Sequence, residues 1–400
     1  MMSLRVGAAA VIGCGGIILL LSFGVRSSFG VFLQPLSTDL GWSREIFAFS
    51  IALQNLLWGV AQPFAGMIAD KYGSGRVILG GALLYAAGTV MMGYATTPMA
   101  AHITAGVLVG VGIAGCGFSI VLAAVGRSVS DRWRSMALGI ASAGGSLGML
   151  VMVPLGQALL QEFDWSLSFV ILGVMSLIMV PLAAALAGKP TAVTTVQSQT
   201  IGESLREAAG HSSYLFLNAG YFVCGFHVAF IAAHFPAYVV DLGLGPEVGA
   251  WALGLVGLVN VFGALAMGAL GDKFSKKYLL STLYMGRAVA ITVFLLTPPS
   301  VASVLIFAGV MGMFWLGTVP VTSALVMQMF GLKHASMLLG IVFFSHQLGS
   351  FAGVWMGGYL FDLTGSYNIV WWLSVALGVA SSILHWPIDE RPIERAPQAA

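Results

Sequence analysis

Charged residues are scarce in this sequence. Only 8% of the 400 residues are charged, whereas 58% are hydrophobic. Soluble domains carry about 25% charged residues, so a soluble fold of this length could not cover its surface. The formal net charge of +2 also gives no reason to expect a nucleic-acid partner. The composition predicts a helical protein that crosses the lipid bilayer many times.

Cysteine is scarce as well. The three cysteines, Cys14, Cys116 and Cys224, stand alone in apolar stretches. This pattern excludes a disulfide scaffold and a cysteine-rich metal site. No other metal-ligand spacing occurs, and we expect neither a metal nor a cofactor. Residues 144–148 fit the G-x-S-x-G pattern of serine hydrolases, but they lie inside an apolar helical run and not at a strand-to-helix turn. We therefore do not expect an enzyme.

Long apolar runs are abundant. About 20 apolar residues in a helix cross about 30 Å of hydrocarbon, and a bilayer accepts only helices or closed barrels. The runs predict an all-α membrane protein with twelve transmembrane helices. The predicted spans are 9–33, 46–69, 77–95, 99–126, 135–158, 166–187, 212–240, 249–270, 278–297, 301–329, 336–359 and 367–386.

The Lys and Arg residues between these runs predict the orientation. Nearly all of them fall on one side of a twelve-span chain, and only Arg44 falls on the other. The positive-inside rule makes the basic side cytoplasmic. Both termini are then cytoplasmic, in a plasma membrane of the bacterial inner-membrane kind. The first run is too long for a signal-peptide core, so we expect it to be retained as a span.

The sequence repeats itself at a spacing of about 201 residues. Residues 24–26 match 225–227, and Pro35 matches Pro236. Several glycines recur at the same spacing, which indicates a duplication of six spans. We therefore predict two pseudo-symmetric six-helix halves joined by a polar cytoplasmic linker. The predicted division is 1–187, 188–211 and 212–400.

Two polar motifs resemble a known transporter class. Residues 66–76, GMIADKYGSGR, resemble the signature of the major facilitator superfamily between helices 2 and 3, and residues 268–277, GALGDKFSKK, resemble its weaker second copy. The resemblance implies alternating access, in which charges at one face hold the halves together and then release them. The gating residues so implied are Asp70, Arg76, Asp272 and Lys273.

A narrower resemblance is to the monocarboxylate transporters and the bacterial oxalate:formate-type family. It rests on residues 24–32, 41–43 and 134–144. The sequence departs from that family in helix 8, where Asn260 and Ala264 stand in place of an acidic residue and an arginine. The resemblance therefore implies the fold, without carrying over the family's substrate chemistry. We expect a monomer.

Two arginines lie within predicted spans. Arg26 and Arg287 have no acidic residue in the middle of any span to pair with. A charge at the bilayer centre costs at least about 2.5–3.5 kcal/mol, so such residues need a function or a partner. A carboxylate substrate would supply the anion. Alternatively, Arg26 could extend to the periplasmic interface, and Arg287 could reach a neighbouring helix or buried carbonyls.

Histidines and aromatic residues complete the predicted site. His227 is the repeat mate of Arg26 and is expected to face it, while His346 lies midway along helix 11. Tyr221 and Trp315 could add polar contacts to the substrate. His227, His234 and His346 are also candidates for carrying a coupled proton, because histidine titrates near neutral pH.

The sequence therefore predicts a secondary transporter of a small organic anion. We expect a monocarboxylate, moved by proton symport or by anion exchange. Two alternatives stay open: a major facilitator exporter of another small molecule, such as a drug or metabolite, and a non-transporting membrane sensor. An exporter of cations would be expected to carry an acidic residue inside the membrane. A sensor would be expected to add a signalling domain.

Overall fold

The computed structural model describes residues 7–187, 200–331 and 335–393, and all regular structure within them is helical. The helices before residue 187 are α1 (Ala8–Leu40), α2 (Arg44–Tyr72), α3 (Ser74–Met92), α4 (Pro98–Ala101), π-helix η1 (His102–Leu108), α5 (Val109–Cys116), α6 (Phe118–Ser128), α7 (Asp131–Glu162), α8 (Trp165–Ser176), α9 (Met179–Ala183) and the 3-10 helix η2 (Ala184–Leu186). Those after residue 200 are α10 (Ile201–Gly210), α11 (Ser212–Asp241), α12 (Pro246–Gly271), α13 (Lys276–Leu296), α14 (Val301–Phe314), α15 (Thr318–Phe330), α16 (Ala335–Thr364) and α17 (Asn368–Leu384).

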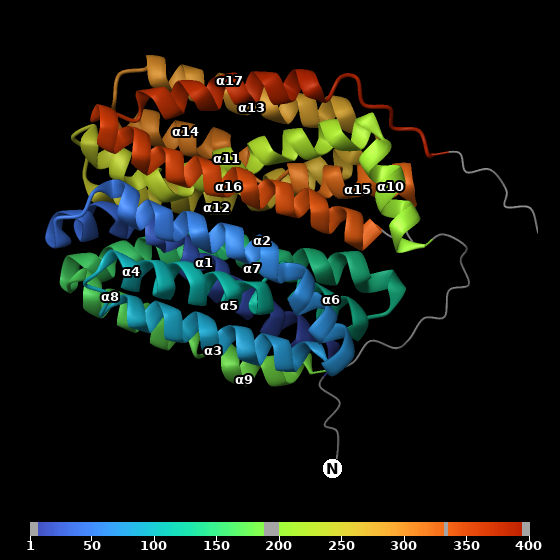
Figure 1. Cartoon of the computed structure of the whole chain (residues 1–400), viewed down its shortest axis with the longest axis horizontal. Coiled ribbons are helices and arrows are strands. Elements are labelled where there is room, and N and C mark those ends of the chain that lie inside the picture. The colour runs from blue at the N-terminus through green and yellow to red at the C-terminus, as the bar shows by residue number, and fades with distance from the viewer. Residues whose placement is uncertain (1–6, 188–199, 332–334, 394–400) are drawn as a thin grey trace, which may run out of the picture.

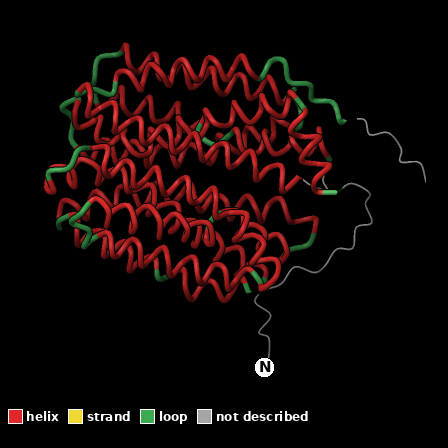
Figure 2. The backbone as a smooth tube through the Cα atoms, in the orientation of Figure 1, coloured by secondary structure: helices red, strands yellow, loops and turns green. Residues whose placement is uncertain are grey.

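The helices run roughly parallel to one long axis (Figure 1). Helices before residue 187, blue to green, form one side of the bundle, and those after residue 200, yellow-green to red, form the other. The described chain begins at Gly7 and ends at Ile393 at the same end of the bundle, which we call the tail end (Figure 1). The α1–α2 turn, residues 41–43, lies at the opposite end. No strand occurs in the described ranges (Figure 2).

The predicted membrane character is confirmed. Within the described ranges, ten segments are long and apolar enough to cross a bilayer. Two further predicted spans also form helices. Helix α17 has 17 residues, and the 29-residue α2 carries Gln54, Asn55 and Gln62 in its interior. The count of twelve spans and the two-fold symmetry of the halves stay predictions.

Three of the predicted spans are interrupted. The span over 166–187 divides at residues 177–178, between α8 and α9. The span over 99–126 divides at Gly117, whose extended backbone (φ −85°, ψ −175°) separates α5 from α6. The span over 301–329 divides between Phe314 and Thr318, which separates α14 from α15. The breaks at Gly117 and after Phe314 leave backbone carbonyls in the bundle interior, where each needs a donor from the protein.

Small residues let the helices approach closely. A Cβ added to Gly30 of α1 would lie 2.1 Å from the carbonyl oxygen of Ala232 in α11, so this contact between the two sides requires glycine. A Cβ on Gly225 of α11 would lie 1.8 Å from the carbonyl of His346 in α16. Membrane helices depend on such contacts because lipid supplies no hydrophobic force between them.

The predicted linker over 188–211 includes a helix that its polar composition did not indicate. Residues 188–199 lie outside the described ranges, but α10 follows them. Its start is a capping box, in which the Thr200 side chain accepts from Glu203 N and the Glu203 carboxylate accepts from Thr200 N. This reciprocal pair satisfies two of the amides that begin the helix.

Candidate functional site

Arg26 lies midway along α1 and points at α2. Its Nη2 donates to Oδ1 of Asn55, and its guanidinium carbon lies 5.3 Å from the centre of the Trp58 ring. Asn55 is held in place because its amide donates to the Ile51 carbonyl at 2.7 Å. The Nε of Arg26 is buried without an acceptor in the described part of the chain. The arginine therefore keeps a buried donor that the protein does not use.

A series of ring contacts leads from Arg26 across to the other side of the bundle. Trp58 contacts Phe343 of α16, with ring centres 5.1 Å apart. Phe343 stacks on His346 at 6.0 Å, and His346 lies 5.1 Å from Tyr221 of α11. Three of the predicted site residues, Arg26, His346 and Tyr221, are thus joined in one cluster between the two sides of the bundle.

His346 and Gln347 add hydrogen-bonding groups to this cluster. His346 Nδ1 lies 3.2 Å from Oε1 of Gln347 and 3.4 Å from Oγ of Ser350. Gln347 packs against Gly59 of α2, where a Cβ would lie 2.8 Å from its own Cβ. The Nε2 of Gln347 is buried, and no acceptor for it lies among the described residues. Unused buried donors favour a ligand that brings acceptors.

Arg287 of α13 is fully buried and binds the broken helix α14–α15. Its Nε and Nη2 donate to the Phe314 carbonyl at 2.9 and 2.7 Å, and Nη2 also donates to the Trp315 carbonyl. Nη2 lies 3.5 Å from Cys224 Sγ. These are the carbonyls released by the break, so Arg287 stabilises it with charge-assisted hydrogen bonds. The predicted site residue Trp315 contacts Arg287 through its backbone carbonyl.

Neither buried arginine has an anionic partner in the described ranges. The ion pairs found there join Arg44 to Asp241 and Arg391 to Asp389. In Arg287, Nε and Nη2 donate to backbone carbonyls, and Nη1 is the nitrogen that has no acceptor among the described residues. Arg26 makes one side-chain hydrogen bond and is less deeply buried. Arg26 is therefore the better placed of the two to meet a substrate.

We expect Arg287→Met to lower the thermal stability of the purified protein strongly. The change leaves the Phe314 and Trp315 carbonyls without donors, at a cost of about 1–3 kcal/mol for each unsatisfied group. Arg26→Met removes one hydrogen bond and should lower the melting temperature less. Thermal unfolding in detergent measures both. Equal melting temperatures for the two variants would contradict the stabilising role of Arg287.

His227 and His234 lie away from this cluster. His227 is fully buried and its Nε2 lies 2.8 Å from the Ser374 carbonyl of α17, so the expectation that it faces Arg26 is corrected. Both nitrogens of His234 have partners, namely the Tyr367 hydroxyl at 3.1 Å and the Val354 carbonyl at 2.8 Å. These contacts stabilise the packing of α11, and the predicted roles of both histidines in transport gain no support from them.

The predicted gating residues lie at the tail end. Asp70, Arg76, Asp272 and Lys273 are all exposed. None of them forms an ion pair with another described residue. Their gating role stays a prediction.

The opposite end carries an ion pair that the sequence analysis missed. Arg44, at the start of α2, makes two hydrogen bonds of 2.6 and 2.7 Å to the carboxylate of Asp241, at the end of α11. The Arg44 side chain is only 11% exposed. Its guanidinium also lies 3.9 Å from the centre of the Phe361 ring and donates to the Tyr367 hydroxyl at 3.1 Å. The sequence contained one indication of this pair: among the Lys and Arg residues between the predicted spans, only Arg44 falls on the side of the membrane opposite to the basic side.

Two more carboxylates extend this contact. Asp362 of α16 accepts from the backbone N–H groups of Arg44 at 3.0 Å and Glu45 at 2.7 Å, so one side of the bundle caps a helix of the other. Such a carboxylate also meets the positive end of the α2 dipole. Glu45 in turn accepts from Trp355 Nε1 at 2.9 Å. We call Arg44, Glu45, Asp241 and Asp362 the latch.

Contacts between the two sides reach from the latch to the middle of the helices. Asn260 of α12 donates to Ser146 Oγ of α7 at 2.9 Å and accepts from Leu316 N, at the helix break, at 2.9 Å. Asn260 stands where the resemblance leads one to expect an acidic residue. Here it joins the break in α14–α15 to the other side of the bundle.

Comparison with known proteins identifies the family. The chain matches the model of the Major Facilitator Superfamily over residues 15–245 and 217–400. It belongs to this superfamily of multi-pass membrane transporters, as the two motifs predicted.

The relatives include monocarboxylate transporters. The chain is 26% identical over 354 residues to the "Uncharacterized MFS-type transporter YcxA" of Bacillus subtilis, covering 86% of each chain. It is 26% identical over 380 residues to "Monocarboxylate transporter 13" of Rattus norvegicus, covering 90% of this chain and 84% of the other. The resemblance to the monocarboxylate transporters is therefore confirmed at the level of sequence, and the resemblance to the oxalate:formate-type family stays a prediction.

Solved structures share the fold. A bacterial homolog of the human lysosomal transporter Spinster, described as inward-facing and unoccupied, has a TM-score of 0.73 at 16% identity, with 94% of both chains covered. A D-xylose-proton symporter has a TM-score of 0.71 at 14% identity, covering 96% of this chain and 99% of the other.

Proposed function

We propose that this protein carries a small monocarboxylate across the membrane by alternating access, and that Arg26 binds the carboxylate. One observation carries the proposal: Arg26 is a cation in the interior of a membrane protein, with a buried Nε–H and no anionic partner in the described ranges. A buried charge without a counter-ion is costly, and a carboxylate supplies both the charge and the acceptors.

Aromatic side chains beside Arg26 suit the apolar body of such an acid. Phe23 lies one turn before Arg26 on α1 and contacts Trp58 and Phe118, with ring centres 5.4 and 4.3 Å away. Phe23, Phe118 and Phe343 are half-buried. In this proposal His346, Tyr221 and Gln347 orient the acid from the other side of the bundle. The relatives named as monocarboxylate transporters support this substrate class.

Alternating access assigns opposite roles to the two ends. In this proposal the latch holds one end closed, while Asp70, Arg76, Asp272 and Lys273 at the tail end form no ion pair with another described residue. In the alternate state the latch opens, and Asp70, Arg76, Asp272 and Lys273 bring the tail end together. The distribution of Lys and Arg supports a cytoplasmic tail end in a plasma membrane. Coupling is to a proton, with His346 as its carrier, or to a counter-anion.

A ligand panel on the purified protein tests the substrate class. Carboxylic acids, their amides and alcohols, amines and sugars are compared for their effect on the melting temperature. A ligand at 100 times its Kd adds about 2.7 kcal/mol to folding stability, so a true substrate produces a clear shift. We expect carboxylates to stabilise and the matched amides not to. Stabilisation by amines or sugars but not by carboxylates would overturn the proposal.

A further inference from the structure

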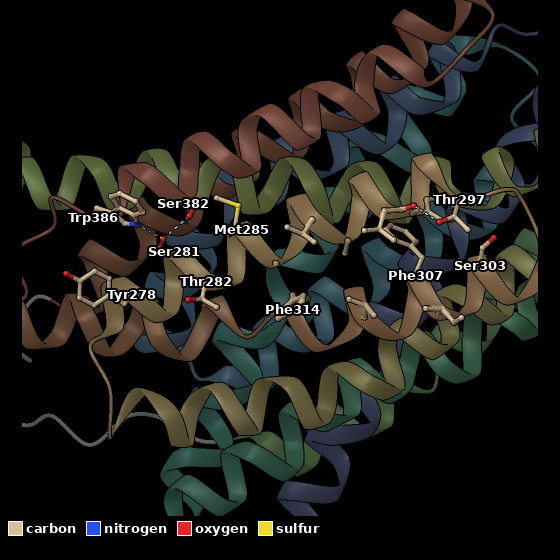
Figure 3. A pocket seen from close by; sticks show the side chains of 17 residues that line it. Tyr278, Ser281, Thr282, Met285, Thr297, Ser303, Phe307, Phe314, Ser382 and Trp386 are labelled. Atoms are coloured by element: carbon tan, nitrogen blue, oxygen red, sulfur yellow. Dashed lines mark hydrogen bonds between the residues drawn. The ribbon is translucent and has the colours of Figure 1, made fainter.

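A long groove runs along the outside of the bundle, apart from the site around Arg26. It has a volume of about 950 Å³ and lies between α13, α14 and α17 (Figure 3). These helices form the edge of the bundle farthest from the helices before residue 187 (Figure 1). Apolar side chains such as Val289, Val293 and Phe307 line most of it. The groove therefore opens toward the surroundings of the protein and not toward the other side of the bundle.

The length of the groove matches the bilayer. On α13 its lining extends from Tyr278 to just beyond the helix at Thr297, which at 1.5 Å per residue is roughly 29 Å. The hydrocarbon core of a bilayer is about 30 Å thick. Val293 and Ile306 are 58% and 67% exposed, so large apolar surfaces border the groove. In a protein that spans the membrane, this surface lies beside acyl chains.

The tail end of the groove is polar. Ser281 Oγ lies 2.8 Å from Ser382 Oγ and accepts from Trp386 Nε1 at 2.8 Å (Figure 3). Tyr278 and Trp386 are each 57% exposed. Aromatic residues of this kind gather where hydrocarbon meets headgroups. The groove therefore has one end suited to the headgroup level and a body suited to hydrocarbon.

Basic residues stand at this polar end. Lys276 begins α13, and Lys277 Nζ donates to the Trp386 and Ile388 carbonyls at 3.1 and 2.9 Å, which holds its charge beside Trp386. Lys273 lies in the preceding turn. Three acidic residues are near: Glu390 accepts from Ser275 Oγ and Lys277 N, Asp389 pairs with Arg391, and Asp272 is exposed. The three lysines and Arg391 outnumber these three carboxylates by one, so this end carries a small positive excess among the described residues.

We propose that this groove is a binding site for a phospholipid of the leaflet at the tail end. Its acyl chain lies along the half of the groove nearer the tail end, beside Met285, Val289 and Phe314, and its phosphate lies at Lys276 and Lys277. The basic end favours a lipid over an apolar transmembrane helix of a partner or of a second copy, because a phosphate brings a full negative charge to the lysines, whereas the end of a helix brings at most about half a charge. The site is independent of the substrate site, so its test does not depend on the carboxylate proposal.

Native mass spectrometry of the purified protein with palmitoyl-oleoyl phosphatidylglycerol tests the site. Ala290→Phe fills the groove, and Lys276→Glu reverses the charge at its polar end. We expect each change to reduce the bound lipid at least fivefold. Val174→Trp, at a 54% exposed position on α8 that lines no groove described here, is the matched control and should keep the parent amount.

The remaining outcomes separate the other occupants. Diacylglycerol with the same chains lacks the phosphate, so we expect it to bind more weakly to the parent and to be insensitive to Lys276→Glu. Unchanged lipid binding in both groove variants would overturn the proposal. Loss of a dimer in Ala290→Phe, with lipid binding intact, would also overturn it and identify a second copy as the occupant. An unchanged melting temperature in Ala290→Phe would show that the variant is folded.

Discussion

Arg26→Ala should abolish uptake of labelled monocarboxylates into proteoliposomes. The change removes the guanidinium that lies beside the aromatic cluster. In the described chain this guanidinium makes one side-chain hydrogen bond, to Asn55, and its buried Nε–H has no acceptor. Truncating one partner of a buried, hydrogen-bonded charge pair costs about 2–5 kcal/mol. That loss corresponds to roughly 30-fold to several-thousand-fold in affinity.

Arg26→Lys should keep part of the activity. Lysine retains the positive charge but loses the planar fork that can bind both carboxylate oxygens, so we expect weaker binding with uptake above that of the alanine variant. Arg206→Ala, at an exposed arginine of α10, is the control and should transport at the parent rate. Uptake near the parent rate in Arg26→Ala, with the carboxylate-induced thermal shift intact, would remove Arg26 from the site.

Reversing one charge of the latch should shift the protein toward the state in which that end is open. Asp241→Arg places two guanidinium groups where Arg44 now makes its two hydrogen bonds. Like charges brought together cost several kcal/mol, and each 1.4 kcal/mol changes a population ratio tenfold. We therefore expect at least a tenfold increase in the open population. Uptake should also slow, because closing this end is part of each cycle.

Spin labels at both sides of that end measure the change. Glu162, at the end of α7, and Glu247, in the first turn of α12, are exposed positions for the labels. Their distance distribution should lengthen in Asp241→Arg. The double variant Arg44→Asp with Asp241→Arg restores opposite charges and should return part of the short distances. The return is partial because Arg44 also packs on Phe361 and bonds Tyr367.

A second ion pair provides the control for the latch. Arg391 and Asp389 lie 2.6 Å apart near the end of the described chain, and the Arg391 side chain is 87% exposed. Exposed pairs of this kind contribute about 0–1 kcal/mol. Arg391→Asp should therefore leave the label distances unchanged. Equal distances in the parent and in Asp241→Arg would show that the latch does not hold this end closed.

Part of the site was predictable and part was not. A rare cation in an apolar run is visible in a sequence, because such a charge needs a reason to remain in hydrocarbon. This identified Arg26 and Arg287. Their different partners were not visible, because Arg287 meets carbonyls released by a break in α14–α15, and a break depends on packing. His227 was misplaced because the repeat predicts its position along a helix but not the direction of its ring.

The sequence by itself determined that this chain is a multi-pass membrane transporter of the major facilitator superfamily. The scarcity of charged residues shows that the chain folds in a lipid bilayer and not in water, and apolar runs of about 20 residues show which segments cross that bilayer. Only the tertiary structure decided that Arg26 reaches Asn55, that Arg287 stabilises a broken helix, and that Arg44 and Asp241 join the two sides at one end. The physical reason is that these contacts join residues far apart in the chain, and their geometry follows from helix rotation and close packing, which no local pattern records.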